Sequence, residues 1–353
     1  MSTWNELVAE FSSQPSDQAR QQWLNARIVS NLHLIRTLRA DRNVILYGSA
    51  FLQKPQAPPQ YISMSGEDID ALMAVIHGMN WDKGLVLILH TPGGITNAAE
   101  SVVAYLRSKF AYIETIVPTF AMSAGTMITL ASDNVVMGRQ SQLGPIDPQM
   151  PYAGRAISAR AVVDQFDSAK LDILGDPAKH IQGDLQMAHV WAPVLSTIGP
   201  SLLQEARNAL AYSERMVSQW LTAYMCRDDS DPGATGQRIA SYFNNASEHL
   251  SHGRRIDRDE CRQQGLRIED LENDQALQEA VLTLYHMMTI VFQNSQATKF
   301  FMSTAGGPWL KQWASPEDQA ALTARQQSTT GRPTLNRPSR ATTPTVRGRK
   351  RGR

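Results

Sequence analysis

The feature that most constrains this chain is a pair of apolar runs, each of which ends in a turn of small residues and passes directly into a helix. The first lies at Leu87–Glu100, LILHTPGGITNAAE, and the second at Pro118–Asp133, PTFAMSAGTMITLASD. A continuous apolar run of this kind is typical of a parallel strand that is buried on both faces. Strands that alternate with helices of this length predict βαβ units and therefore an α/β fold with a mostly parallel sheet.

The alternation extends to both sides of these segments. We expect strands at 43–52, 84–90, 112–118 and 134–137, and helices at 17–39, 65–79, 97–110 and 123–131. The sequence Ser65-Gly-Glu-Asp68 is a variant of the capping box, with Ser65 as the N-cap residue. After Met150 the strand signal fades, and helical spacing continues at 158–174, 200–225, 234–245, 258–264 and 274–293.

Four parts follow from this pattern. We expect an N-terminal helical segment at 1–42, an α/β core at 43–155, a helical C-terminal region at 156–315 without a second sheet, and a disordered tail at 316–353. Nine of the 34 Lys and Arg residues lie between Arg325 and Arg353, and none of the 33 Asp and Glu residues does. This basic tail has two interpretations that stay open: it contacts an anionic surface or nucleic acid through counterion release, or it is a solvated end.

The remaining composition indicates an ordinary globular protein, with 42% hydrophobic and 19% charged residues. Cys226 and Cys261 form no CxxC motif, so we expect reduced thiols.

The most apolar stretch, Ala280–Phe292, is shorter than the roughly 20 residues that span a bilayer. We therefore expect a cytoplasmic protein without a transmembrane segment, and peripheral membrane contact stays open. No metal-ligand spacing and no Walker or GxGxxG motif is present, so we expect no metal and no cofactor.

The two turns have the residues that acyl transfer needs. A hydroxyl nucleophile must stand on a sharp turn, and two backbone N–H groups must face the developing oxyanion. Ser123 followed by Ala124, together with Gly93 and Gly94, would satisfy both needs if the two strand ends are neighbours. Each segment alone also has a structural interpretation, since Gly-Gly turns are common in α/β proteins and Ser-Ala-Gly also serves helix capping and packing.

The strings HTPGG and AMSAGTMI resemble the ClpP/SppA group of serine proteases, and more closely the bacterial serine dehydrogenase proteinase family. The resemblance continues through MGRQSQLGPIDPQ (137–149), VWAPVL (190–195) and LENDQALQEAVL (271–282), and it covers roughly 43–299. It implies a ClpP/crotonase-like stack of βαβ units and a homo-oligomer. It also implies that Ser123 is the nucleophile, that the amides of Gly94 and Ala124 form the oxyanion hole, and that Gly93 shapes the turn.

The general base is not apparent from the motifs. The stretch at 143–150, where ClpP-type enzymes carry their histidine, has Asp147 and no histidine. The SppA-like branch uses a lysine, and Lys170 lies in a helix where its spacing predicts a place near the apolar face. Burial would lower the pKa of such a lysine toward neutrality and make it a usable base. We predict Lys170 as the base, with Lys179, His180 and His189 as alternatives.

Two further residues are predicted to line the substrate groove, His90 before the Gly-Gly turn and Asp147 after the nucleophile helix. The alternatives are a packed histidine at a strand end and an aspartate that shapes a turn between prolines. The sequence thus predicts an ATP-independent serine peptidase that acts on peptides or proteins. Two other functions stay open: a crotonase-like acyl-thioester enzyme that needs no serine nucleophile, and a catalytically inactive scaffold that keeps the fold.

Overall fold

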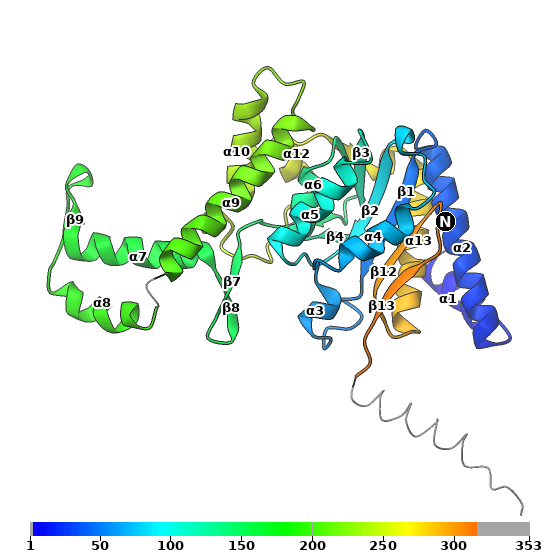
Figure 1. The fold of residues 1–353 in the computed structure, drawn as a ribbon, viewed down its shortest axis with the longest axis horizontal. Helices are drawn as coiled ribbons and strands as arrows, with labels where there is room; N and C mark the ends of the chain where they lie inside the picture. The colour runs from blue at the N-terminus through cyan, green and yellow to red at the C-terminus, as the bar shows by residue number, and fades with distance from the viewer. Residues whose placement is uncertain (1–2, 199–200, 316–353) are drawn as a thin grey trace, which may run out of the picture. The chain divides into compact units, whose positions relative to one another are not determined.

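The computed structural model describes residues 3–198 and 201–315 (Figure 1). Its helices are α1 Trp4–Ser12, α2 Asp17–Leu38, α3 Pro59–Ile62, α4 Asp68–Ile76, α5 Thr96–Arg107, α6 Ala124–Leu130, α7 Ala159–Leu174, α8 Met187–Ser196, α9 Leu202–Ala223, α10 Pro232–Asn244, α11 Ala246–His249, α12 Arg258–Gln263 and α13 Gln275–Gln293, with 3₁₀ turns η1 Trp81–Lys83, η2 Pro177–Lys179 and η3 Leu271–Asn273. Its strands are β1 Asn43–Ser49, β2 Leu85–His90, β3 Ile113–Val117, β4 Phe120–Ala121, β5 Asn134–Met137, β6 Gln142–Leu143, β7 Gln149–Tyr152, β8 Arg155–Ser158, β9 Gly175–Asp176, β10 Ile181–Gln182, β11 Ile268–Asp270, β12 Ala297–Ser303 and β13 Trp309–Gln312.

Seven of these strands form the central sheet, in the order β11-β5-β3-β2-β1-β12-β13. The first five run parallel, whereas β12 is antiparallel to β1 and β13 is antiparallel to β12. The chain moves from β1 to β2, β3 and β5 through helices, so the βαβ units predicted from the sequence are confirmed. Because the carboxyl ends of parallel strands lie at one edge, the turns after β2 and β3 become neighbours there.

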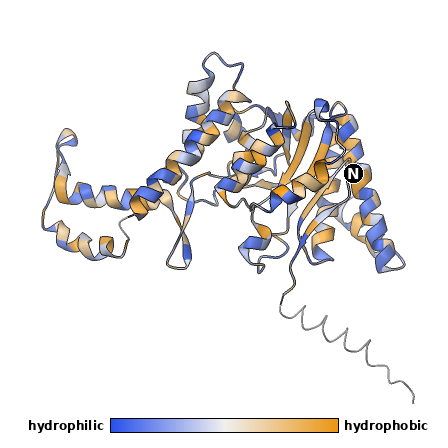
Figure 2. Ribbon diagram, viewed as in Figure 1, coloured by the Kyte–Doolittle hydropathy of each residue, from blue (hydrophilic) through white to orange (hydrophobic). Residues whose placement is uncertain are grey.

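Both faces of the sheet are covered, which explains the unbroken apolar runs. In β1, Val44 and Leu46 pack on one face with the helices α1, α2 and α13, while Ile45 and Tyr47 pack on the other with α4, α5 and α6. The hydropathy colouring shows these strands as a continuous hydrophobic layer between amphipathic helices (Figure 2). The sequence therefore places alternate residues of each strand in two separate cores.

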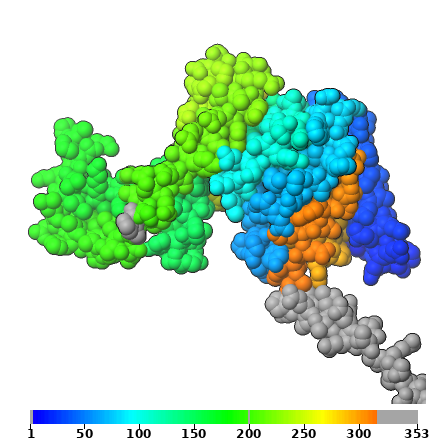
Figure 3. Space-filling model, in the orientation of Figure 1, coloured from blue at the N-terminus to red at the C-terminus, as the bar shows by residue number. Residues whose placement is uncertain are grey.

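The segment 159–196, here called the arm, comprises α7, the β9–β10 hairpin and α8. Its helix α7 packs on α9 through Val162 and Val163, against Ala206 and Leu210. Beyond this contact the arm contributes little to a core, since α8 contains no buried residue. Figure 3 shows the arm at the left of the view with its surface open on the face in view.

The region 156–315 contains strands that the sequence did not predict. This region contains the expected helices, but it also supplies β11, β12 and β13 to the central sheet. The strand β12 was hidden in the sequence because Lys299 interrupts its apolar run, ATKFFMS. That lysine is fully buried and paired, which local sequence patterns do not reveal.

Three other expectations concern the chain outside the sheet. Cys226 and Cys261 are both buried and unpaired with each other. Among the helices that the structure describes, none has both the length and the apolar character needed to cross a bilayer. The predicted basic tail at 316–353 lies outside the described residues.

Candidate active site

The two small-residue turns meet at the carboxyl edge of the sheet. The turn after β2 contains Gly93, whose positive φ of 92° suits glycine. A Cβ atom at Gly93 would lie 2.5 Å from the Met122 carbonyl oxygen, 2.6 Å from Ser123 Cβ and 2.9 Å from the Ala124 nitrogen. The backbones of the two turns are therefore in direct contact, and only glycine fits between them.

Ser123 stands at the sharpest point of the second turn. It directly precedes α6 and has a φ of 51°, in the left-handed region that residues with a Cβ rarely adopt. Its side chain makes no capping bond to α6, and the residue is half-buried. A strained residue of this kind persists where the surrounding structure holds it, which is common at functional sites. The conformation presents the hydroxyl outward instead of using it to cap the helix.

Two backbone N–H groups beside Ser123 are left without a partner. Ala124 is the first residue of α6, so its N–H has no acceptor within the helix. The N–H groups of Gly93 and Ile95 donate to Thr91 Oγ1 and to the Met64 carbonyl, at 3.1 Å each. Across the described part of the chain, the N–H groups of Gly94 and Ala124 have no acceptor. The site thus has a hydroxyl with two free amide donors on adjoining turns.

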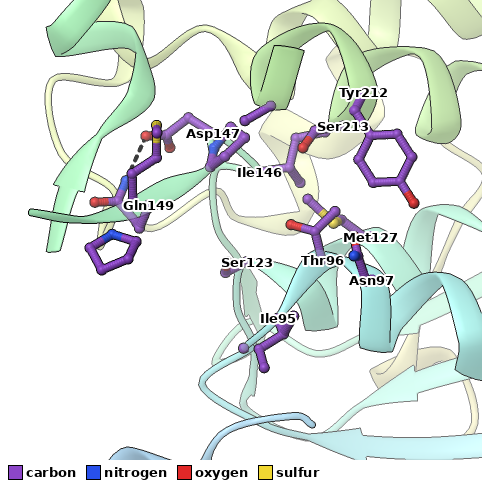
Figure 4. A pocket seen from close by; sticks show the side chains of 15 residues that line it. Ile95, Thr96, Asn97, Ser123, Met127, Ile146, Asp147, Gln149, Tyr212 and Ser213 are labelled. Atoms are coloured by element: carbon purple, nitrogen blue, oxygen red, sulfur yellow. Dashed lines mark hydrogen bonds between the residues drawn. The ribbon is translucent and has the colours of Figure 1, made fainter. Parts of the chain in front are cut away.

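Ser123 and Gly94 line a cavity of about 420 Å³ (Figure 4). Its other walls come from the start of α5, from Met127 of α6, from residues 146–151, which lead into β7, and from α9. At its rim, the hydroxyl of Tyr212 donates to Glu100, and burial together with this bond raises the pKa of Tyr212 to about 12. The cavity has room for a substrate group next to the hydroxyl.

Asp147 lines the same cavity, as a groove residue should, but its carboxylate is turned away from Ser123. Figure 4 shows it directed toward Gln149, whose Nε2 donates to Oδ2 at 2.9 Å. The hydroxyl of Ser158 donates to the same oxygen at 3.1 Å, and His252 Nδ1 lies 2.8 Å from Oδ1. Asp147 is 1% exposed, so these partners balance a buried charge. The histidine beside Asp147 was not predicted, because no spacing links residues 105 positions apart.

The structure does not bring Lys170 to Ser123 within one chain. The expectation that Lys170 would be buried is wrong, because α7 turns Val162, Val163 and Ala169 toward α9 and leaves Lys170 exposed. Lys170 lines a separate cavity of the arm together with Lys179. Its role as general base stays a prediction, and it cannot be fulfilled in the cavity of its own chain as the arm is placed here.

The alternative bases are also on the arm. Lys179, His180 and His189 are all exposed, and Lys179 pairs with Asp176 at 3.5 Å. Within the described ranges, no lysine or histidine lines the cavity that contains Ser123. The cavity of a single chain therefore lacks a side chain of the type predicted for the base.

His90 is not a groove residue, contrary to the prediction. It shares one face of β2 with Val86 and Ile88, so its ring faces the core formed with α13, and His90 is 0% exposed. Its Nδ1 lies 2.8 Å from Thr119 Oγ1, and the aromatic rings of Phe51, Phe120 and Tyr285 surround it. Burial lowers the pKa of His90 to about 3. The structural alternative, a packed histidine at a strand end, is correct.

The described residues contain no group of three or more His, Cys, Asp and Glu side chains that could hold a metal ion.

Other residues at the site were not predicted from the sequence, because they act through their backbone or through pairs that are distant in the chain. Met64 brackets the Gly93–Gly94 turn, and Thr91 accepts from it. The only sequence signal for Thr91 was its place at the head of the TPGG turn.

The segment that carries this site is similar in sequence to known proteins. A family model described as ClpP-like SDH-type serine proteinase matches residues 20–182, from α2 to β10. The uncharacterized protein MJ0137 of Methanocaldococcus jannaschii is 36% identical over 133 residues, which is 36% of this chain and 46% of its own length. The uncharacterized protein MJ1495 of the same organism is 30% identical over 135 residues, which is 37% of this chain and 46% of its own length. The chain thus spans about half the length of these relatives.

Among solved structures, a mutant of the 1510-N membrane-bound stomatin-specific protease aligns over 30% of this chain and 55% of its own. Its identity is 21% and its TM-score is 0.25. The family match confirms the resemblance predicted from the sequence. The mostly parallel sheet with its flanking helices agrees with the ClpP-like fold predicted with it.

Proposed function

We propose that the protein is an ATP-independent serine peptidase with Ser123 as its nucleophile, since residues 20–182 match the family model of the ClpP-like SDH-type serine proteinases. The observation that carries the proposal is the turn at Ser123. A half-buried hydroxyl on a residue with positive φ faces a cavity, and the backbone of the Gly93–Gly94 turn lies against it. This arrangement suits attack on an amide carbonyl.

The free N–H groups of Gly94 and Ala124 are the proposed oxyanion hole. When the Ser123 oxygen adds to the carbonyl carbon, negative charge develops on the carbonyl oxygen, and two amide donors already in place stabilise it without reorganisation. Loss of one such donor typically lowers turnover by about 10²–10³-fold. Collapse of the intermediate then breaks the C–N bond and leaves an acyl-enzyme for water to hydrolyse.

Lys170 remains the proposed general base, and the exposed arm suggests how it reaches the nucleophile. We extend the proposal to a homo-oligomer in which the arm of one chain carries Lys170 into the Ser123 cavity of another. Three apolar side chains of the arm support this contact: Leu174, Leu185 and Val190 are 62%, 73% and 60% exposed. Large exposed apolar side chains that cluster on one segment are typical of a protein interface. Desolvation in that contact would lower the pKa of the lysine.

A fluorophosphonate probe tests the nucleophile directly, because it captures a reactive serine covalently. We expect labelling at Ser123 and its loss in Ser123→Ala. The base is tested by co-expressing Ser123→Ala and Lys170→Ala chains with different tags, neither of which is labelled alone. If Lys170 acts on a second chain, the mixed oligomer regains labelling on the Lys170→Ala chain. Lys179→Ala serves as the control and should be labelled like the wild type.

The second candidate function is a catalytically inactive scaffold. It is favoured by one observation, that the cavity has no lysine or histidine in the described chain. A folded oligomer that is not labelled at any pH from about 6 to 9 would support the scaffold and exclude the peptidase, because an activated serine reacts in that range.

A further inference from the structure

A buried ion pair lies behind the Gly93–Gly94 turn. Lys299 of β12 and Asp68 of α4 have side chains that are 0% and 1% exposed, and Lys299 Nζ lies 2.5 Å from Asp68 Oδ1. A buried ion pair is weak evidence for stability, because well-packed apolar residues of similar volume are often equally good or better. The other contacts of the pair indicate a different role.

Asp68 also holds the segment that precedes α4. Its second oxygen, Oδ2, accepts the hydroxyl of Tyr47 at 2.7 Å and the backbone N–H of Ser65 at 3.0 Å. An ionised carboxylate is an acceptor-only group with enough lone pairs for all three donors. The charge of Lys299 balances the charge of the buried Asp68 carboxylate, and hydrogen bonds that involve charged groups are stronger than those between neutral groups.

The residue next to Ser65 brackets the glycine turn. Met64 N–H donates to the Gly93 carbonyl at 2.7 Å, and Ile95 N–H donates to the Met64 carbonyl at 3.1 Å. A Cβ at Gly94 would lie 2.3 Å from the Met64 carbonyl oxygen, so the two backbones are in contact. Met64 therefore bonds to the carbonyl of Gly93 and to the N–H of Ile95, on both sides of Gly94. The N–H of Gly94 has no acceptor among the described residues. The path from Asp68 to this amide passes through Ser65 and Met64.

A second path reaches the nucleophile turn through Thr91. Thr91 Oγ1 accepts the N–H of Gly93, and the carbonyl of Thr91 accepts the N–H of Met122 at 3.1 Å. The Thr91 hydroxyl also neighbours the hydroxyl of Tyr47. Burial and the charge of Asp68 raise the pKa of Tyr47, and the contact with Thr91 opposes a part of this rise. Asp68 and Tyr47 are thus linked to the two turns of the site through Ser65, Met64 and Thr91.

We propose that Asp68, with Lys299 as its buried counter-ion, is a positioning residue, which holds the Gly93–Gly94 turn so that its free amide lies beside the Ser123 hydroxyl. This inference rests on the proposed function, because it explains how the proposed oxyanion hole keeps its shape. Asp68 acts through its bond to the Ser65 amide, and Lys299 balances the buried charge of the carboxylate. Neither residue lines the cavity that contains Ser123.

Two double variants separate the hydrogen bond from the charge. Asp68→Leu/Lys299→Met removes both charges and every acceptor at position 68, whereas Asp68→Asn/Lys299→Met removes both charges but keeps an oxygen for the Ser65 amide. The matched control is Asp133→Leu/Arg107→Met. Asp133 likewise accepts a backbone N–H, that of Ile113 at 2.8 Å, and pairs with the buried Arg107 at 2.8 Å, but it does not contact either turn.

The measurement is the saturation kinetics of fluorophosphonate labelling on the full chain, with the melting temperature measured in parallel. For Asp68→Leu/Lys299→Met we expect the maximal labelling rate to fall about 100-fold, as a misplacement of about 1 Å does in other enzymes. The half-saturating probe concentration should stay within a few-fold, because the cavity walls are unchanged. Asp68→Asn/Lys299→Met and the control should keep most of the wild-type rate.

An unchanged rate in Asp68→Leu/Lys299→Met overturns the inference, and so does an equal loss in both double variants. If Asp68→Leu/Lys299→Met does not fold, Tyr47→Phe takes its place. It leaves the ion pair intact, should slow labelling several-fold, and counts against the inference if the rate is unchanged. A wild-type chain that is not labelled at Ser123 refutes the proposed function itself, which is a separate result from labelling that is insensitive to Asp68.

Discussion

Gly93→Ala is the sharpest test of the contact between the two turns. Alanine at this position meets two separate obstacles. It must adopt a φ of 92°, and its Cβ would lie 2.5 Å from the Met122 carbonyl oxygen and 2.6 Å from Ser123 Cβ. Ordinary van der Waals contacts between such atoms begin roughly 1 Å farther away. The neighbouring atoms are backbone atoms and the Cβ of Ser123, so they cannot rotate aside.

The expected magnitudes follow from these two obstacles. An L-residue in the left-handed region costs about 1–2 kcal/mol, which lowers the melting temperature by a few degrees. Relieving the clash requires the turns to separate by about 1 Å, and a displacement of this size at a reacting group costs on the order of 100-fold in rate. We therefore expect fluorophosphonate labelling of Ser123 to slow about 100-fold in a folded protein.

A matched glycine separates the two obstacles. Gly78 has a φ of 83°, and a Cβ there would meet no atom within 4 Å. Gly78→Ala should therefore lower the melting temperature by a similar amount and leave the labelling rate unchanged. Equal labelling of Gly93→Ala and the wild type would refute the contact between the turns. Equal slowing of both glycine variants would show that the loss arises from strain alone.

Three further predictions concern other parts of the chain. Arg39→Met leaves the carboxylate of Glu114, which is 0% exposed, without its strongest partner. Urea unfolding should show that the free energy of unfolding falls by about 3–5 kcal/mol, and a fall below about 1 kcal/mol would contradict the pairing. Burial lowers the pKa of His90 to about 3, so the unfolded chain binds a proton below pH ~6.5 that the folded chain excludes. As the pH falls from ~6 to ~4, the free energy of unfolding of the wild type should therefore decrease by about 1.4 kcal/mol per pH unit more than that of His90→Gln. Parallel curves of unfolding free energy against pH would refute the burial of His90. Leu185→Asp, at a side chain that is 73% exposed, should dissociate the proposed oligomer in light scattering without lowering the melting temperature, and an unchanged mass would remove the arm from the interface.

Much of the fold was accessible from local patterns. The predicted strand at 134–137 coincides with β5, and the helix expected at 17–39 is α2 at Asp17–Leu38. The predicted capping box is half correct: the side chain of Asp68 accepts the N–H of Ser65, but α4 begins at Asp68 and its N-cap residue is Glu67, not Ser65. These elements were predictable because periodicity, capping and turn residues act within a few positions of each other.

Local patterns failed where a contact partner is distant in the chain. Lys299 and Asp68 are 231 positions apart, so β12 was not recognised as a strand and its lysine was not recognised as buried. The spacing around Lys170 correctly predicted an amphipathic helix but did not show which side of it faces α9. Similarly, His90 has the same neighbours in sequence whichever face of β2 it occupies.

The sequence by itself determined the βαβ units, the two glycine- and serine-bearing turns, and the match of residues 20–182 to the ClpP-like SDH-type serine proteinase family model. Only the tertiary structure decided that these turns are in contact, that His90 faces the other core, and that Lys170 lies exposed on an arm away from the cavity of its own chain. The physical reason is the range of the interactions. Hydrogen bonds within a turn or a helix are set by adjacent residues, whereas the neighbours of a buried charge depend on how the whole sheet is ordered.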